Sequence, residues 1–156
     1  MKSATIPEIK KVLISLEQEE LVELCLRMAK YKKENKELLN YLLYEASDEN
    51  AYIKKVKEEL DSLFAELPRS QSYIIKKGHR KILKTTNKYI KYAHSKVVEI
   101  ELLIYFCRKM KEMKYVASIR DALQPIFDVQ IKKIEKHLPV LHEDLQYDYR
   151  MEFEKL

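Results

Sequence analysis

The sequence has very little glycine and no tryptophan: Gly78 is its one glycine, beside four prolines. Tight β-hairpins and phosphate-binding loops depend on residues with positive φ, which glycine adopts most readily. An all-helical chain needs far fewer of them. The composition, 46% hydrophobic and 35% charged, is that of a folded protein rather than a disordered one. We therefore predict an all-α fold.

Cysteine is also scarce, and long apolar runs are missing. Cys25 and Cys107 both lie in apolar helical runs, where a thiol behaves as a small buried hydrophobe. We expect no disulfide, which fits a reducing compartment. The longest apolar run, residues 102–107, has six residues, whereas a membrane-spanning helix needs about 20. The N-terminus lacks the apolar stretch of a secretory signal. We expect a cytoplasmic protein that does not engage a membrane.

Motifs of common enzymes are missing as well. The sequence has no P-loop, no GlyXGlyXXGly, no GlyXSerXGly, no HisGluXXHis and no CysXXCys. His79 falls on the apolar side of a helical pattern and is expected in the core. His137 and His142 flank Pro139, so they do not stack on one helix face as a metal pair would. We predict no catalytic residues, metal, cofactor or small-molecule substrate. An enzyme whose site forms only in three dimensions is the remaining alternative.

Capping signals divide the N-terminal part of the chain into short helices. Thr5 and Glu8 have the spacing of a capping box and predict a helix to about Leu16. A second helix begins with glutamates and closes in lysines, as the helix dipole favours. Asn35 is predicted to cap a third helix.

The middle of the chain is predicted to hold longer helices. Ser47 or Asp48 can cap a fourth helix, which Pro68 ends. A basic fifth helix follows, and no breaker separates it from the apolar residues after it. The basic helix and the apolar segment after it therefore form either one long helix or two helices with a kink near His94. The pattern leaves both possibilities open. Residues 102–106 are apolar on every side, which predicts a central helix buried by several neighbours.

Short connections favour antiparallel neighbours. We predict an array of antiparallel helical hairpins, six to eight helices in all, forming a bundle or a short repeat-like stack. Pro125 and Pro139 are each expected to start or kink a segment. We expect one domain over 1–156. A subdivision near Pro68 would separate hairpins at 1–67 from the basic helix and C-terminal helices at 69–156.

Acidic residues are missing between Glu66 and Glu99, a stretch with nine basic residues. The other 21 of the 30 basic residues are outnumbered by the 25 acidic ones, so the net charge of +5 is local. Basic residues without acids at i±4 cannot neutralise each other within their own helix. The nine residues are Arg69, Lys76, Lys77, Arg80, Lys81, Lys84, Lys88, Lys91 and Lys96.

Helical periodicity gathers most of these charges on one face. Five lysines at spacings of 4, 3, 4 and 3 lie opposite the apolar face and form a straight row about 21 Å long. We call this row the lysine stripe. It consists of Lys77, Lys81, Lys84, Lys88 and Lys91. Together with Arg80 beside it, these residues are the candidates for binding a partner. Three interpretations stay open: a solvated face, docking on an acidic surface of this chain or of a second copy, and an external anionic partner.

The stripe favours a binding function over catalysis. We predict a non-catalytic helical interaction module that docks an acidic protein surface, including the case in which that surface belongs to a homo-oligomer. The alternative is nucleic-acid backbone binding, because spaced ammonium groups replace condensed counterions. Such binding would not depend on base sequence, since lysine is a point charge and base edges are commonly read by Arg, Asn and Gln.

Four segments also carry a resemblance to a known family. They are IKKVLISLEQEELVELCL (9–26), YKKENKELLNYLL (31–43), YIKKVKEEL (52–60) and SYIIKKGHRKI (72–82). This pattern resembles a family of small uncharacterised bacterial all-helical proteins, catalogued only as a domain of unknown function. The resemblance extends to about Lys114. It implies an all-helical bacterial cytosolic protein with no assigned activity, and it offers no catalytic residues.

Overall fold

The structure, a computed structural model, describes residues 3–68 and 71–156. The chain is 84% helical and the described residues form no β-strand, which confirms the all-α prediction. The α-helices are α1 (Ile6–Ile14), α2 (Gln18–Tyr31), α3 (Lys33–Asn40), α4 (Glu49–Ala65), α5 (Ser72–Ala93), α6 (Lys96–Glu112), α7 (Ala117–His137) and α8 (Glu143–Phe153). A π-helical turn, η1 (Tyr41–Glu45), follows α3, and a 3₁₀ turn, η2 (Leu138–Val140), follows α7.

The chain divides into two compact units, an N-terminal unit (Met1–Tyr44) and a C-terminal unit (Glu45–Leu156). Pro68 lies within the second unit, between α4 and α5, and these two helices pack against each other. The division therefore falls within η1 and not near Pro68. The sequence gives no composition change at Tyr44, because η1 continues the helical pattern of α3.

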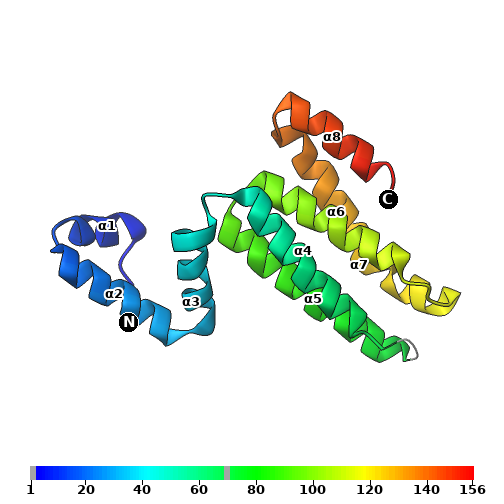
Figure 1. Cartoon of the computed structure of the whole chain (residues 1–156), viewed down its shortest axis with the longest axis horizontal. Helices are drawn as coiled ribbons and strands as arrows, with labels where there is room; N and C mark the ends of the chain where they lie inside the picture. The colour runs from blue at the N-terminus through cyan, green and yellow to red at the C-terminus, as the bar shows by residue number, and fades with distance from the viewer. Residues whose placement is uncertain (1–2, 69–70) are drawn as a thin grey trace. The chain divides into compact units, whose positions relative to one another are not determined.

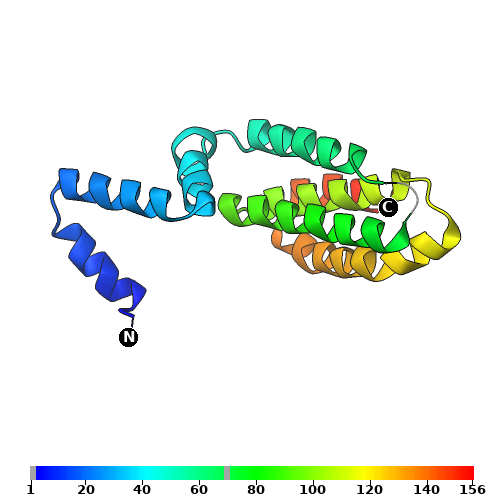
Figure 2. The ribbon, with the colours of Figure 1, turned by 90° about the horizontal axis from the view of Figure 1, so that it is seen from below.

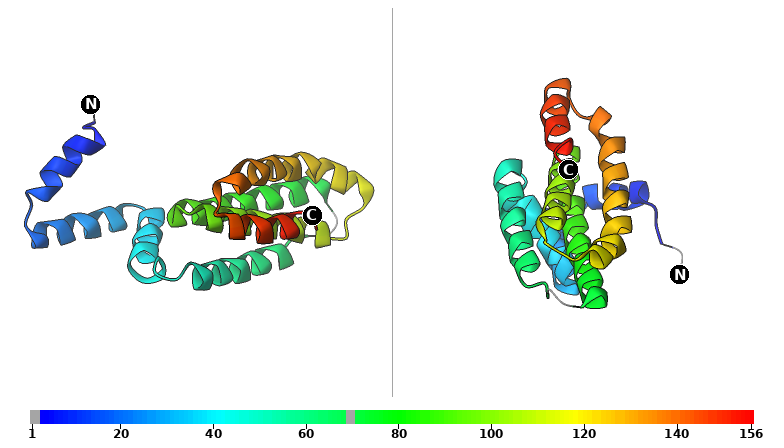
Figure 3. Two further views of the ribbon diagram at one scale, coloured as in Figure 1. Left: turned by 90° about the horizontal axis from the view of Figure 1, so that it is seen from above. Right: turned by 90° about the vertical axis from the view of Figure 1, so that its right-hand side faces the viewer.

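The C-terminal unit is a bundle in which successive helices run in opposite directions (Figure 1). Helix α6 packs against α4, α5, α7 and α8, and α5 packs against α4, α6 and α7. In the right panel of Figure 3, α5 and α6 lie between α4 and α7. Figure 2 shows α4 as the outer helix on one side of this unit. Every described helix is too short or too polar to cross a membrane.

Helix α6 is the centre of this unit, as its all-round apolar sequence predicts. Val98, Leu102, Leu103, Phe106 and Cys107 have no accessible surface. Contacts with four neighbouring helices cover it from several sides. The prediction of a central helix is confirmed.

The basic helix and the central helix are separate elements. His94 adopts a left-handed conformation (φ 49°), and its N–H donates to the Ile90 carbonyl at 3.1 Å, which ends α5. Ser95 then caps α6, with its side-chain oxygen accepting from the Val98 N–H at 3.5 Å. A non-glycine residue in this conformation is uncommon, and histidine is among the types that tolerate it. The break lies where the sequence allowed a kink.

The predicted caps are confirmed in two cases and wrong in one. Glu8 accepts from the Thr5 N–H at 2.7 Å, which completes the capping box, and Asp48 caps α4. Asn35 does not cap α3, because it lies inside that helix. Its side-chain nitrogen instead donates to the Met28 carbonyl at 2.9 Å, which satisfies an orphan acceptor near the end of α2.

The prolines and cysteines give mixed outcomes. Pro125 does not start a segment, since α7 continues through it, while Pro139 lies in the 3₁₀ turn before α8. Cys107 is buried as predicted. The expectation that Cys25 is buried is wrong, because it lies in the N-terminal unit, where Tyr41 is the one buried residue among those described.

Candidate functional site

The apolar face of α5 fixes the direction of the lysine stripe. Ile75, His79, Ile82, Thr86 and Ile90 recur every three or four residues and are all buried. These residues face α4, α6 and α7, on which α5 packs. The opposite face of a helix packed in this way is left to solvent.

The stripe residues are exposed, with one exception. Lys88 is half-buried, because its Nζ lies over the Tyr89 ring, 4.7 Å from the centroid, and 6.0 Å from that of Tyr92. This arrangement is a cation–π contact. The exposed members are Lys77, Lys81, Lys84 and Lys91, and Arg80 beside the stripe is exposed as well. Arg69, the first basic residue of the acid-free stretch, lies outside the described residues.

The exposed members of the stripe, and Arg80 beside it, have no acidic partner within the part of the chain that the structure describes. Lys77, Arg80, Lys81, Lys84 and Lys91 make no ion pair there. Other lysines of the same unit do make ion pairs: Lys55 lies 2.8 Å from Glu45, for example. Unlike Lys55, these cations have no counter-charge on a described residue.

The acidic terminal helix does not neutralise the stripe. Helix α8 packs on α6 and η2. Glu152 of α8 forms an ion pair with Arg108 of α6 and another with Lys155, at 2.8 Å. The interpretation in which the stripe docks on this helix of its own chain is therefore not supported.

A second charged cluster lies between α6 and α7, and sequence reasoning missed it. Glu99 is buried, with 7% of its surface exposed. Its carboxylate lies 2.7 Å from Lys96 Nζ, 3.2 Å from Lys133 Nζ and 3.2 Å from His137 Nδ1. The sequence offered one signal of this cluster, which is that Glu99 itself lies among apolar residues just before Ile100. Its partners on α7 are more than thirty positions away, so no local pattern reveals them.

The cluster holds Glu99 in its ionised form. Burial alone would raise the pKa of this carboxyl, but hydrogen bonds from Lys96 and Lys133 and the nearby His137 outweigh burial and lower the pKa below its ordinary value. This arrangement joins α6 to α7. The cluster is therefore a structural link between the two helices.

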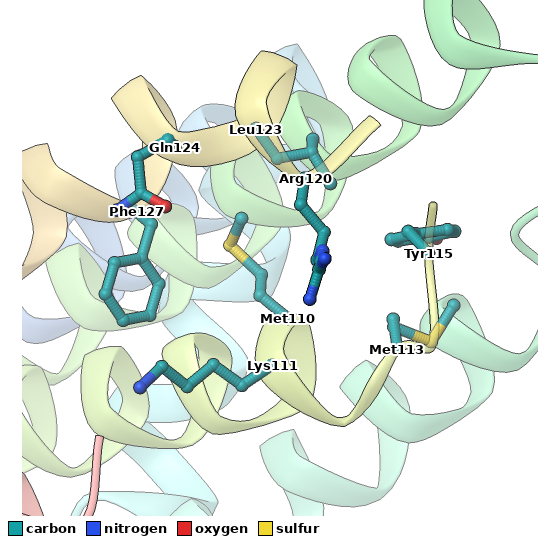
Figure 4. A pocket seen from close by; sticks show the side chains of 8 residues that line it. All are labelled: Met110, Lys111, Met113, Tyr115, Arg120, Leu123, Gln124 and Phe127. Atoms are coloured by element: carbon teal, nitrogen blue, oxygen red, sulfur yellow. The ribbon is translucent and has the colours of Figure 1, made fainter. Parts of the chain in front are cut away.

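A hollow of about 480 Å³ lies at the junction of α6 and α7. Figure 4 shows the side chains that line it. In this view Arg120 lies between Phe127 and Tyr115, beside Met110. Lys111 Nζ lies 5.5 Å from the centroid of the Phe127 ring. The lining of the hollow contains two cationic side chains, Lys111 and Arg120, and no carboxylate or histidine. The hollow therefore lacks the paired acid and base that general acid–base chemistry requires.

None of the histidines considered in the sequence lines this hollow, although the His79 ring packs edge-on against Tyr115, which does, with 5.7 Å between the ring centroids. His79 is fully buried, as predicted, and its Nδ1 is 2.9 Å from the Ile75 carbonyl. Burial lowers the pKa of His79 below its ordinary value, so the ring is neutral at pH 7. His142 is exposed, 3.5 Å from Asp144. Among the described residues, no group of three His, Cys, Asp or Glu side chains could hold a metal ion.

Comparisons of this chain with protein-family models, with curated proteins and with solved structures find no match. The resemblance to a bacterial family of unknown function therefore stays a prediction.

Proposed function

We propose that this protein is a non-catalytic interaction module whose helix α5 docks an acidic protein surface through the lysine stripe. The observation that carries the proposal is the set of exposed cations without partners: Lys77, Arg80, Lys81, Lys84 and Lys91 make no ion pair with a described residue. Five cations held on one rigid helix repel one another until an anionic surface meets them.

The spacing of the stripe indicates the kind of acidic surface. Lysines at 4, 3, 4 and 3 positions follow one face of a helix and repeat about every 5.4 Å. A partner helix with Glu or Asp at the same spacing presents carboxylates with the same repeat. The partner class is therefore an acidic amphipathic helix about four turns long. A charged stripe of this kind contributes orientation and association rate more than affinity.

A synthetic helical peptide with glutamates at this spacing tests the proposal. We expect the wild-type protein to bind it and the K77E/K81E/K84E variant to bind at least tenfold more weakly. A peptide of the same composition with its glutamates distributed around the helix is the matched ligand control. The matched protein control is K114E/K132E/K136E, which changes net charge equally at exposed lysines of the same unit that make no ion pair with a described residue. Equal loss in both variants would contradict a role for the stripe.

Duplex DNA distinguishes the nucleic-acid alternative. If the five stripe lysines replace counterions on duplex DNA, log K falls with log salt at a slope of about −4.5. Retention of DNA with this slope, together with failure to bind the acidic peptide, would favour backbone binding instead.

A further inference from the structure

The N-terminal unit has almost no core of its own. Tyr41 is its one buried residue among those described, while 14 large hydrophobic side chains in it are exposed. Helix α1 has nine residues and α3 has eight, and helices shorter than about 12–15 residues are marginal in water without tertiary packing. A unit of this size needs an apolar surface from elsewhere to stay folded.

Helix α2 presents the most regular of these apolar faces. Leu21, Leu24 and Met28 follow one another at helical spacing, and 39% of Leu24 and 63% of Met28 are exposed. A hollow of about 760 Å³ runs beside this face. Its lining includes Leu16 and Leu24 and four charged side chains: Glu20, Glu23, Arg27 and Lys30.

The charges along this hollow are arranged by sign. Glu20 and Glu23 lie toward the N-terminal end of α2, and Arg27 and Lys30 toward its C-terminal end. None of the four makes an ion pair with another described residue. Glu20 and Arg27 are seven positions apart, about 10.5 Å along the axis, too far for direct pairing within one helix.

We propose that this face of α2 binds the α2 helix of a second copy of this chain, in antiparallel orientation. A two-fold axis between Glu23 and Leu24 brings Glu20 of each copy opposite Arg27 of the other. Leu24 of each copy then lies beside the axis, opposite Glu23 of the other copy. A parallel pair would instead place like charges together, so the charge order selects the antiparallel dimer. An isologous interface of this kind requires a self-complementary surface, and α2 has one.

This interface is separate from the lysine stripe, because α2 and α5 belong to different units. The dimer therefore carries two stripes, and a partner with two acidic helices gains effective concentration from the pairing. The proposal goes beyond the proposed function and does not rest on it. The K77E/K81E/K84E variant is expected to dimerise as the wild type does.

Charge reversal across the interface gives the decisive experiment, with sedimentation velocity on the full chain as the measurement. We expect the wild type to dimerise in the micromolar range and E20R and R27E each to weaken dimerisation at least tenfold. Mixed in equal amounts, the two variants are expected to form a heterodimer, because each supplies the charge that the other needs. Glu20 also accepts from the Glu17 N–H at 3.0 Å, so E20R loses a cap; loss of helix alone would not be rescued by mixing.

Crosslinking tests the register. In a Cys25→Ser background, Leu24→Cys is expected to crosslink two chains efficiently with a short bis-maleimide, since position 24 lies beside the two-fold axis. Val22→Cys, exposed on another side of α2, is the matched control and is expected to crosslink poorly. A wild type that remains monomeric through the micromolar range, variants that do not form a heterodimer, or equal crosslinking at 22 and 24 would each overturn the proposal.

Discussion

Gly78 of α5 lies so close to Leu67 that a Cβ added to the glycine would stand 2.3 Å from Leu67 Cδ2. The backbone of Gly78 is helical and does not need positive φ. The one glycine of the chain is therefore explained by close approach to the turn between α4 and α5, not by conformation.

This proximity predicts coupling between the two positions. Alanine is favoured over glycine inside a helix by about 1 kcal/mol. In the Gly78→Ala variant we expect that gain to be cancelled by displacement of the Leu67 side chain. In a Leu67→Ala background the same substitution should raise the free energy of unfolding by about 1 kcal/mol. Urea unfolding of the four proteins measures the coupling, and equal effects in both backgrounds would contradict it.

The Glu99 cluster predicts an acid-dependent loss of stability. In Glu99→Gln we expect the free energy of unfolding at neutral pH to fall by about 1–2 kcal/mol, because hydrogen bonds to a charged group are lost. The folded-state pKa of Glu99 lies below its ordinary value. Its contribution is therefore complete above the ordinary glutamate pKa of about 4.3 and disappears as the pH falls through the lower folded value.

Urea unfolding of the wild type and of Glu99→Gln at several pH values measures this effect. The difference between the two proteins is expected to shrink in acid. Glu135→Gln removes an exposed glutamate of α7 without an ion pair to a described residue, and it should change stability much less. A difference that stays constant down to acid pH would show that the carboxylate of Glu99 is not the group responsible.

The stripe predicts a salt effect of opposite sign to that of an ordinary ion pair. Lys84 has Lys81 three positions before it and Lys88 four after it, and each like-charge pair costs about 0.2–0.5 kcal/mol. Lys84→Gln should therefore raise the free energy of unfolding by about 0.5 kcal/mol at low salt and have no effect at high salt.

Lys57 provides the comparison for this prediction. It forms an ion pair with Glu101 of α6. Lys57→Gln should lower stability at low salt, the reverse of Lys84→Gln. Thermal unfolding at low and high salt separates the two. A lower stability of Lys84→Gln at low salt would indicate an acidic neighbour that the structure does not place beside it.

The two thiols should differ sharply in reactivity. Burial raises the pKa of Cys107 to about 12, with nearby Lys111 acting weakly in the other direction, whereas Cys25 is exposed. A thiolate is the reactive form. We expect an aromatic disulfide reagent to label Cys25 in the folded protein and Cys107 only in denaturant. In the Cys25→Ser variant, unfolding should therefore limit the rate at which Cys107 is labelled. Fast labelling of this variant without denaturant would contradict the burial of Cys107 in α6.

Local signals predicted much of this fold. Thr5 with Glu8, and Asp48, were readable as caps because a cap depends on residues within one turn of it. The central position of α6 was also predictable, because residues 102–106 are apolar on every side of the helix. The Asn35 prediction failed because α3 begins two residues earlier, at Lys33, so that Asn35 lies inside the helix and its side-chain nitrogen donates to the Met28 carbonyl of α2.

The candidate site was predictable only in part. Periodicity alone placed Lys77, Lys81 and Lys84 on the face opposite the buried side of α5. Whether a carboxylate from another helix would meet them depends on packing, which no spacing within α5 encodes. The same limit hid the contacts of Glu99 with Lys133 and His137, whose helix is distant in sequence.

The left-handed residue at His94 also sets the reach of the basic face. Since the chain turns away after Ala93, the row of ammonium groups stops at Lys91 and cannot extend along α6. An acidic helix longer than the stripe would meet no cationic residue of α5 after Lys91. The turn thus limits the length of acidic helix that the stripe can contact. Lengthening the acidic peptide past four turns should therefore not raise its affinity.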